Sequence, residues 1–110
     1  MLLRKLAISL FLVFSLNVSA DVQDDRKGFI QKLIGMNVFQ KVEIPGSLPH
    51  LWVKPSFNSL SFDEKNSFVN VVYSYYYTLD PSYSIVVLYD SLSGKKIGTF
   101  SASYGGLDLK

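Results

Sequence analysis

The sequence predicts an α+β fold, a small and mainly antiparallel sheet of four or five strands with one or two helices packed on one face. Two segments with helical features and four with strand-like patterns, in the order α-β-β-α-β-β, support this prediction. The 110 residues, 48% of them hydrophobic and 18% charged, suffice for one small domain. We place a signal peptide at residues 1–20 and the single domain at 21–110. The chain has no cysteine, so packing and not disulfides must stabilise the domain.

The N-terminal segment has the three parts of a secretory signal peptide. Arg4 and Lys5 supply the positive region, and residues 6–16 are apolar apart from two serines. Val18 and Ala20 are small or modest side chains at the positions that signal peptidase reads. We therefore expect cleavage after Ala20 and an exported bacterial protein, periplasmic or secreted, that meets the membrane only transiently. The alternative is an uncleaved anchor, which would make the chain a membrane-tethered subunit of an envelope complex.

The first element of the domain is a predicted helix. Asp24 and Asp25 can cap its start, and Gly35 is expected just after its end. Four apolar residues recur at helical spacing and form one stripe: Phe29, Ile30, Leu33 and Ile34.

A hairpin is predicted next. In residues 38–44, Val38, Gln40, Val42 and Ile44 alternate with Phe39, Lys41 and Glu43, as the residues on the two faces of a strand do. Residues 51–53 are predicted to form a second short strand. Between them, residues 45–49 contain two prolines and a glycine, which favour a turn.

A capping box starts the second predicted helix, with Ser61 as N-cap and Glu64 three residues later. The following run, residues 68–77 (FVNVVYSYYY), is compatible with one broad helical face or with one face of a strand. Its β-branched and aromatic content favours a strand, whereas the acidic, capped start favours a helix. We predict a helix here.

The last third of the chain predicts strands joined by turns. Residues 83–89 (YSIVVLY) are continuously apolar, which is typical of a strand buried on both faces. Turn residues at 90–94 lead to a returning strand over 95–101, and after a turn at 104–106, residues 107–109 are a candidate edge strand.

The residue inventory offers little for catalysis. His50 is the only histidine and lies beside Pro49 in a predicted turn, so we interpret it as a turn residue. Most of the carboxylates fall at predicted helix starts and turns, and no metal-ligand spacing or nucleophile motif occurs. We therefore predict no catalytic site, no metal and no cofactor. The alternative is a small periplasmic hydrolase in which folding brings a carboxylate to His50.

Tyrosine density is the most unusual feature of the domain. All seven tyrosines lie in the second half of the chain, four of them in the second predicted helix, where they spread over more than half its circumference. We therefore expect Tyr73 or Tyr77 at the surface or in a groove. Trp52 with His50 and Phe57 forms a second candidate patch. The candidate binding residues are thus Tyr73, Tyr77, Trp52 and His50, since such side chains are favoured at recognition surfaces.

Net charge does not indicate nucleic acid as a partner. The formal charge of the chain is +2, but Arg4 and Lys5 lie in the predicted signal peptide, which leaves nine basic against nine acidic side chains in the domain. No cluster of positive charge is visible. We expect a small, exported, non-enzymatic binding or accessory protein with the general profile of inhibitors and immunity proteins. Its partner would be a protein or a glycan of the cell envelope, bound through an aromatic and polar surface.

Overall fold

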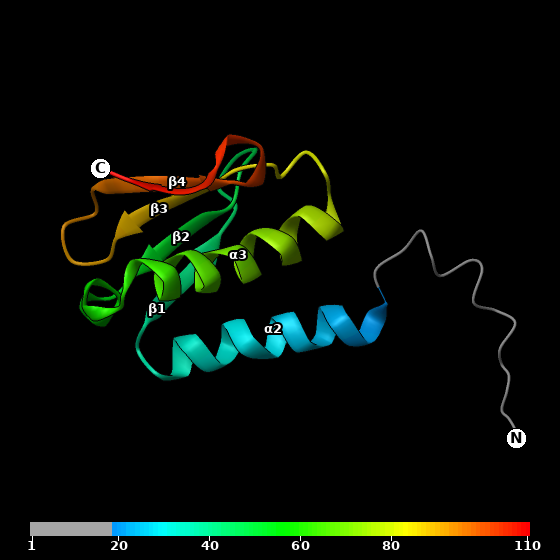
Figure 1. Ribbon diagram of the computed structural model, residues 1–110, viewed down its shortest axis with the longest axis horizontal. Helices are drawn as coiled ribbons and strands as arrows, with labels where there is room; N and C mark the ends of the chain where they lie inside the picture. The colour runs from blue at the N-terminus through cyan, green and yellow to red at the C-terminus, as the bar shows by residue number, and fades with distance from the viewer. Residues whose placement is uncertain (1–18) are drawn as a thin grey trace, which may run out of the picture.

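The computed structural model describes residues 19–110 (Figure 1). Two helices, two short 3₁₀ turns and five strands follow one another along the chain: α2 (Ala20–Gly35), β1 (Phe39–Glu43), β2 (His50–Val53), η1 (Pro55–Ser59), α3 (Phe62–Leu79), β3 (Val86–Asp90), β4 (Lys96–Ser101), η2 (Ala102–Tyr104) and β5 (Gly106–Leu109). The predicted signal peptide lies outside the described residues except for Ser19 and Ala20, so the structure does not test it.

The fold is α+β, as predicted, but its sheet is mixed. The strands stand in the order β1-β2-β3-β4-β5. Three of the four pairings are antiparallel, but β2 and β3 run parallel, so the sheet is mixed and the antiparallel prediction needs this correction at its centre. The parallel pairing arises because α3 connects β2 to β3 and returns the chain to the end of the sheet from which β2 started.

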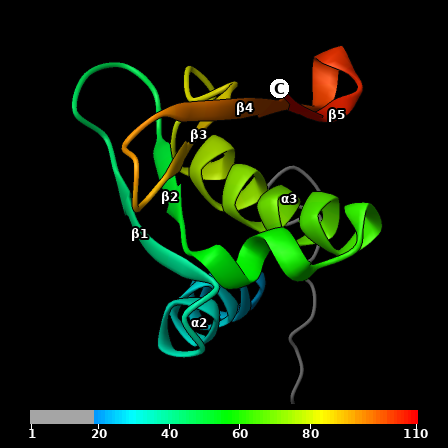
Figure 2. The same cartoon turned by 90° about the vertical axis from the view of Figure 1, so that its left-hand side faces the viewer.

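Both helices lie on one side of the sheet, with α3 against it and α2 beside α3 (Figures 1 and 2). Helix α3 contacts β3, β4 and β5, while α2 contacts α3 and β1. The core fills the space between these layers. Its largest fully buried side chains include Phe39, Phe57, Leu51 and Leu88. No helix of the described residues is long and apolar enough to span a membrane.

The start and end of α2 differ from the prediction. Ser19 is the N-cap, because its extended backbone precedes the helix and its Oγ accepts a hydrogen bond from the Val22 N–H at 3.2 Å. Asp24 and Asp25 therefore lie inside the helix. Gly35 is its last residue, and the left-handed conformation that ends many helices falls on Asn37, with φ of 61°.

The predictions for α3 are confirmed. Ser61 Oγ accepts from the Glu64 N–H at 3.1 Å, and the Glu64 carboxylate accepts from the Ser61 N–H at 2.9 Å, completing the capping box. The ambiguous run 68–77 is entirely helical. Residues Val69 and Val72 on its inner face are fully buried.

The predicted hairpin is confirmed as the antiparallel pair β1 and β2. The strand expected from Tyr83 starts only at Val86, because a turn formed around Asp80 occupies the preceding residues. Residues 107–109 do form an edge strand, β5, which lies so close to β4 that a Cβ added at Gly98 would collide with the Asp108 carbonyl.

Candidate functional site

The face of the sheet opposite the helices, which we call the outer face, carries an ordered row of side chains. Register places Lys41 opposite Trp52, Trp52 beside Tyr89, and Tyr89 opposite Lys96. Cross-strand partners share a face, so these four residues form one row across four strands. We call it the aromatic row. It has two stacked rings in the middle and a cation at each end.

A second row runs next to it on the outer face. It consists of Glu43, His50, Val87, Thr99 and Asp108, again partnered strand by strand. Both ends of this row are acidic. Lys41 and Glu43 make an exposed ion pair of 3.3 Å along β1, which links the two rows.

The two rings of the aromatic row are stacked on one another. The ring centroids of Trp52 and Tyr89 are 4.7 Å apart and their planes differ by 22°. That separation matches the spacing of neighbouring strands, about 4.8 Å, so each ring rises from its own strand. The His50 ring lies 4.9 Å from Tyr89, and the Lys41 ammonium lies 5.2 Å from the Trp52 ring centroid. Rings and cation therefore pack against one another and contribute favourable ring–ring and cation–π contacts.

One polar atom of the aromatic row has no partner. The Nε1–H of Trp52 is buried and makes no hydrogen bond with any residue between 19 and 110. An unsatisfied buried donor costs about 1–3 kcal/mol, so natural proteins rarely keep one without a reason. It is the single buried side-chain nitrogen or oxygen without a partner in the described part of the chain.

His50 packs against the aromatic row. It is the first residue of β2, its ring is tilted by 40° against that of Tyr89, and its side chain makes no hydrogen bond or ion pair within residues 19–110. No group of three histidine or acidic side chains in this part of the chain is arranged to hold a metal ion.

Two turn carboxylates have lowered pKa values for local reasons. Hydrogen bonds from the hydroxyl and backbone N–H of Ser93 lower the pKa of Asp90, and corresponding bonds from Ser82, the backbone one first, lower that of Asp80. Asp80 is exposed and Asp90 is half-buried, and each carboxylate stabilises its own turn.

The structure separates the sequence-predicted binding residues into two places. Trp52 and His50 lie on the outer face, whereas Tyr73 and Tyr77 stack on each other at 5.5 Å on α3, on the helical side. Tyr73 is buried against Phe100, and Tyr77 is exposed.

The predicted patch with Trp52 and His50 does not include Phe57. This side chain is fully buried in the core on the helical side of the sheet, 6.3 Å from the ring centroid of Phe39. Tyr89 takes its place beside Trp52. Sequence reasoning missed Tyr89 because the apolar run 83–89 predicts burial on both faces. The alternation along β3, which turns Val87 and Tyr89 away from Val86 and Leu88, was the signal that could have found it.

Comparisons of the chain with protein families, with curated proteins and with solved structures gave no match.

Proposed function

We propose that this chain is a small, exported, non-enzymatic binding protein whose outer face docks a protein partner of the cell envelope. The observation that carries the proposal is the aromatic row with its unpartnered Trp52 N–H. Trp and Tyr dominate the energetic centres of protein interfaces, and charged residues flank such centres. A donor left unsatisfied in the free protein gains a hydrogen bond if docking turns the indole toward an acceptor of the partner.

The arrangement of the rings favours a protein over a glycan. A sugar ring binds an aromatic side chain by lying flat on its face. Both faces of the Trp52 ring are already covered, one by Tyr89 and the other by the Lys41 ammonium. What the aromatic row offers to a partner is ring edges and polar tips, which the varied side chains of a protein can match.

The charges of the outer face define what the partner must provide. Lys41 and Lys96 end the aromatic row, while Glu43 and Asp108 end the adjacent row. All four are exposed. A complementary partner places acidic groups over the first pair and basic groups over the second, and these contacts set orientation and association rate more than affinity.

Site-specific photo-crosslinking tests the proposal in cells that express the full-length chain. A photoreactive phenylalanine analogue at Thr99, in the middle of the outer face, should give a discrete protein adduct in the envelope fraction. The matched control places the analogue at Asn70, which is exposed on α3, and should give no such adduct.

Charge reversal then connects the adduct to the aromatic row. Lys41→Glu should lower the adduct yield several-fold, whereas Lys32→Glu on α2 should leave it unchanged. Equal adducts from Thr99 and Asn70, or an adduct insensitive to Lys41→Glu, would contradict docking at the outer face. The absence of any protein adduct, together with retention of the chain on envelope polysaccharide, would favour a glycan instead.

A further inference from the structure

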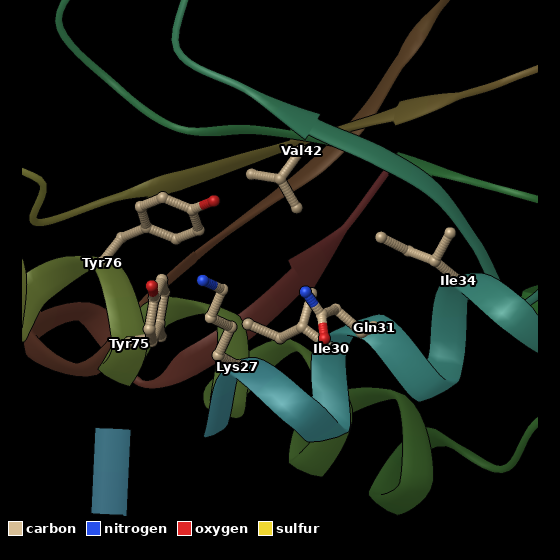
Figure 3. Close-up of a pocket in the computed structure, with 7 residues that line it drawn as sticks. All are labelled: Lys27, Ile30, Gln31, Ile34, Val42, Tyr75 and Tyr76. Carbon is tan, nitrogen blue, oxygen red and sulfur yellow. The ribbon is translucent and has the colours of Figure 1, made fainter. Parts of the chain in front are cut away.

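A groove lies on the helical side of the protein, between α2, α3 and β1 (Figure 3). Its volume is about 170 Å³. The floor of the groove is apolar and consists of Ile30, Ile34 and Val42. Four polar side chains complete the lining: Lys27, Gln31, Tyr75 and Tyr76. The groove is separate from the outer face because Val42 points to the opposite side of β1 from Lys41 and Glu43.

Several of the polar lining residues face the space inside the groove. Figure 3 shows Lys27, Gln31 and Tyr76 with their polar ends directed into the space between the elements. Lys27 makes no ion pair within residues 19–110, where the two ion pairs involve other lysines. No acidic side chain lines the groove. Its electrostatic character is therefore that of one uncompensated cation surrounded by hydrogen-bond donors.

The tyrosine hydroxyl stays a donor throughout the physiological pH range. Burial, followed by the neighbouring Tyr75, raises the pKa of Tyr76 above its ordinary value of 10.0. The protonated phenol can donate to an anion, as can the amide of Gln31 and the ammonium of Lys27. Charge-assisted hydrogen bonds of this kind are the stronger ones.

The size of the groove limits the ligand to a small molecule. A protein cavity of about 150 Å³ holds benzene, so about 170 Å³ accommodates one ring or a short chain. Ile30, Ile34 and Val42 offer that group an apolar floor formed by two elements.

We propose that this groove binds a small organic anion, a carboxylate attached to one apolar ring or a short aliphatic chain. The carboxylate lies at Lys27, with Gln31 and Tyr76 as further donors, and the apolar part lies over Ile30, Ile34 and Val42. This site is independent of docking at the outer face, and either one can fail without the other.

The test is an NMR titration of protein obtained by expressing the full-length chain. Sodium benzoate is the probe. Its neutral analogue benzyl alcohol tests the apolar ring without the charge, and inorganic phosphate tests the negative charge without the ring. Benzoate should shift the backbone amide signals of Ile34 and Val42 saturably, with a Kd of about 1–10 mM for so small a molecule. Benzyl alcohol and phosphate should each bind at least about fivefold more weakly.

Matched lysine variants locate the charge. Lys27→Gln should raise the benzoate Kd about five- to tenfold, because an exposed charge contributes less than a buried one. Lys27→Arg should retain binding, and Lys32→Gln, on the same helix outside the groove, should change the Kd less than twofold. Retained amide dispersion in each variant shows that the fold is intact.

Three results would overturn the proposal. The first is no saturable shift of groove signals up to about 50 mM benzoate, well above the expected Kd. The second is equal binding of benzyl alcohol or phosphate, which would show that only the apolar floor or only the charge is recognised. The third is a benzoate Kd that Lys27→Gln leaves unchanged.

Discussion

Replacing Trp52 by phenylalanine distinguishes the contribution of an aromatic ring at this position from that of the unpartnered indole N–H. Phenylalanine keeps an aromatic ring beside Tyr89, has no N–H, and is smaller than tryptophan by the outer benzo part of the indole. Most replacements of a large side chain by a smaller one destabilise a protein. At this position the buried donor makes no hydrogen bond within the described residues, so we expect the opposite or no effect.

The expected magnitude follows from two opposing terms. Removing a buried donor without a partner recovers about 1–3 kcal/mol. Exchanging indole for phenyl gives up contact area of the order of 50 Å², which is about 1–1.5 kcal/mol if all of that area is buried. Trp52 is only half-buried, so the actual loss is smaller. The free energy of unfolding of Trp52→Phe should therefore be unchanged or higher by up to about 2 kcal/mol.

The assay is urea unfolding followed by far-UV circular dichroism, since the variant lacks the only tryptophan. Phe57→Leu is the control, because it also reduces an aromatic side chain but at a fully buried site without a polar atom. It should lose about 1–3 kcal/mol. A fall of more than about 1 kcal/mol in the free energy of unfolding of Trp52→Phe would mean that the indole N–H is hydrogen-bonded in solution, contrary to the unpartnered donor described above.

Three further predictions concern stability and can be measured by the same urea unfolding. Gly98→Ala should lower the free energy of unfolding by about 1–3 kcal/mol, because the added Cβ collides with the Asp108 carbonyl. An unchanged urea midpoint would show that β5 is not held against β4. Asn66→Ala should lower the free energy of unfolding by about 1–3 kcal/mol, because Asn66 Oδ1 accepts a hydrogen bond from the buried Leu107 N–H at 3.0 Å. Asn66→Asp keeps an acceptor, so an equal loss of stability in that variant would argue against this hydrogen bond. The lowered pKa of Asp90 means that its carboxylate stabilises the folded state above the unfolded pKa, near 3.9, and that this stabilisation disappears as pH falls through the lower folded value. Asp90→Asn should therefore show a smaller loss of stability below about pH 4 than the unchanged chain, and identical pH profiles would contradict the assignment.

Local signals in the sequence were enough to predict most elements of the fold. Ser61 and Glu64 define the start of α3 because a capping box involves residues only three apart. The prolines at 45 and 49 interrupt the chain between β1 and β2, so the hairpin is also a local feature. The start of α2 differs from the prediction because its cap, Ser19, lies upstream of the expected cleavage point and so outside the predicted domain.

Contacts between distant parts of the chain could not be predicted in this way. Nothing near Trp52 or Tyr89 in the sequence indicates that their strands are neighbours, and the parallel pairing of β2 with β3 depends on how α3 packs. The aromatic row exists only through that pairing. The candidate site was consequently predicted in part, through Trp52 and His50, while Tyr89 and both lysines of the row required the structure.

The parallel pairing of β2 with β3 also has a consequence for the order of folding. Strands β1 and β2 are close in the chain, as are β3, β4 and β5, but the two groups are separated by all of α3. Closing that long loop costs more chain entropy than forming either group, so the central pairing should be completed last. Trp52 lies on β2 at this pairing and stacks on Tyr89 only after β2 and β3 have paired. In a stopped-flow refolding experiment, the single tryptophan therefore reports the final joining of the two halves of the sheet, after the circular dichroism signal of the helices has developed.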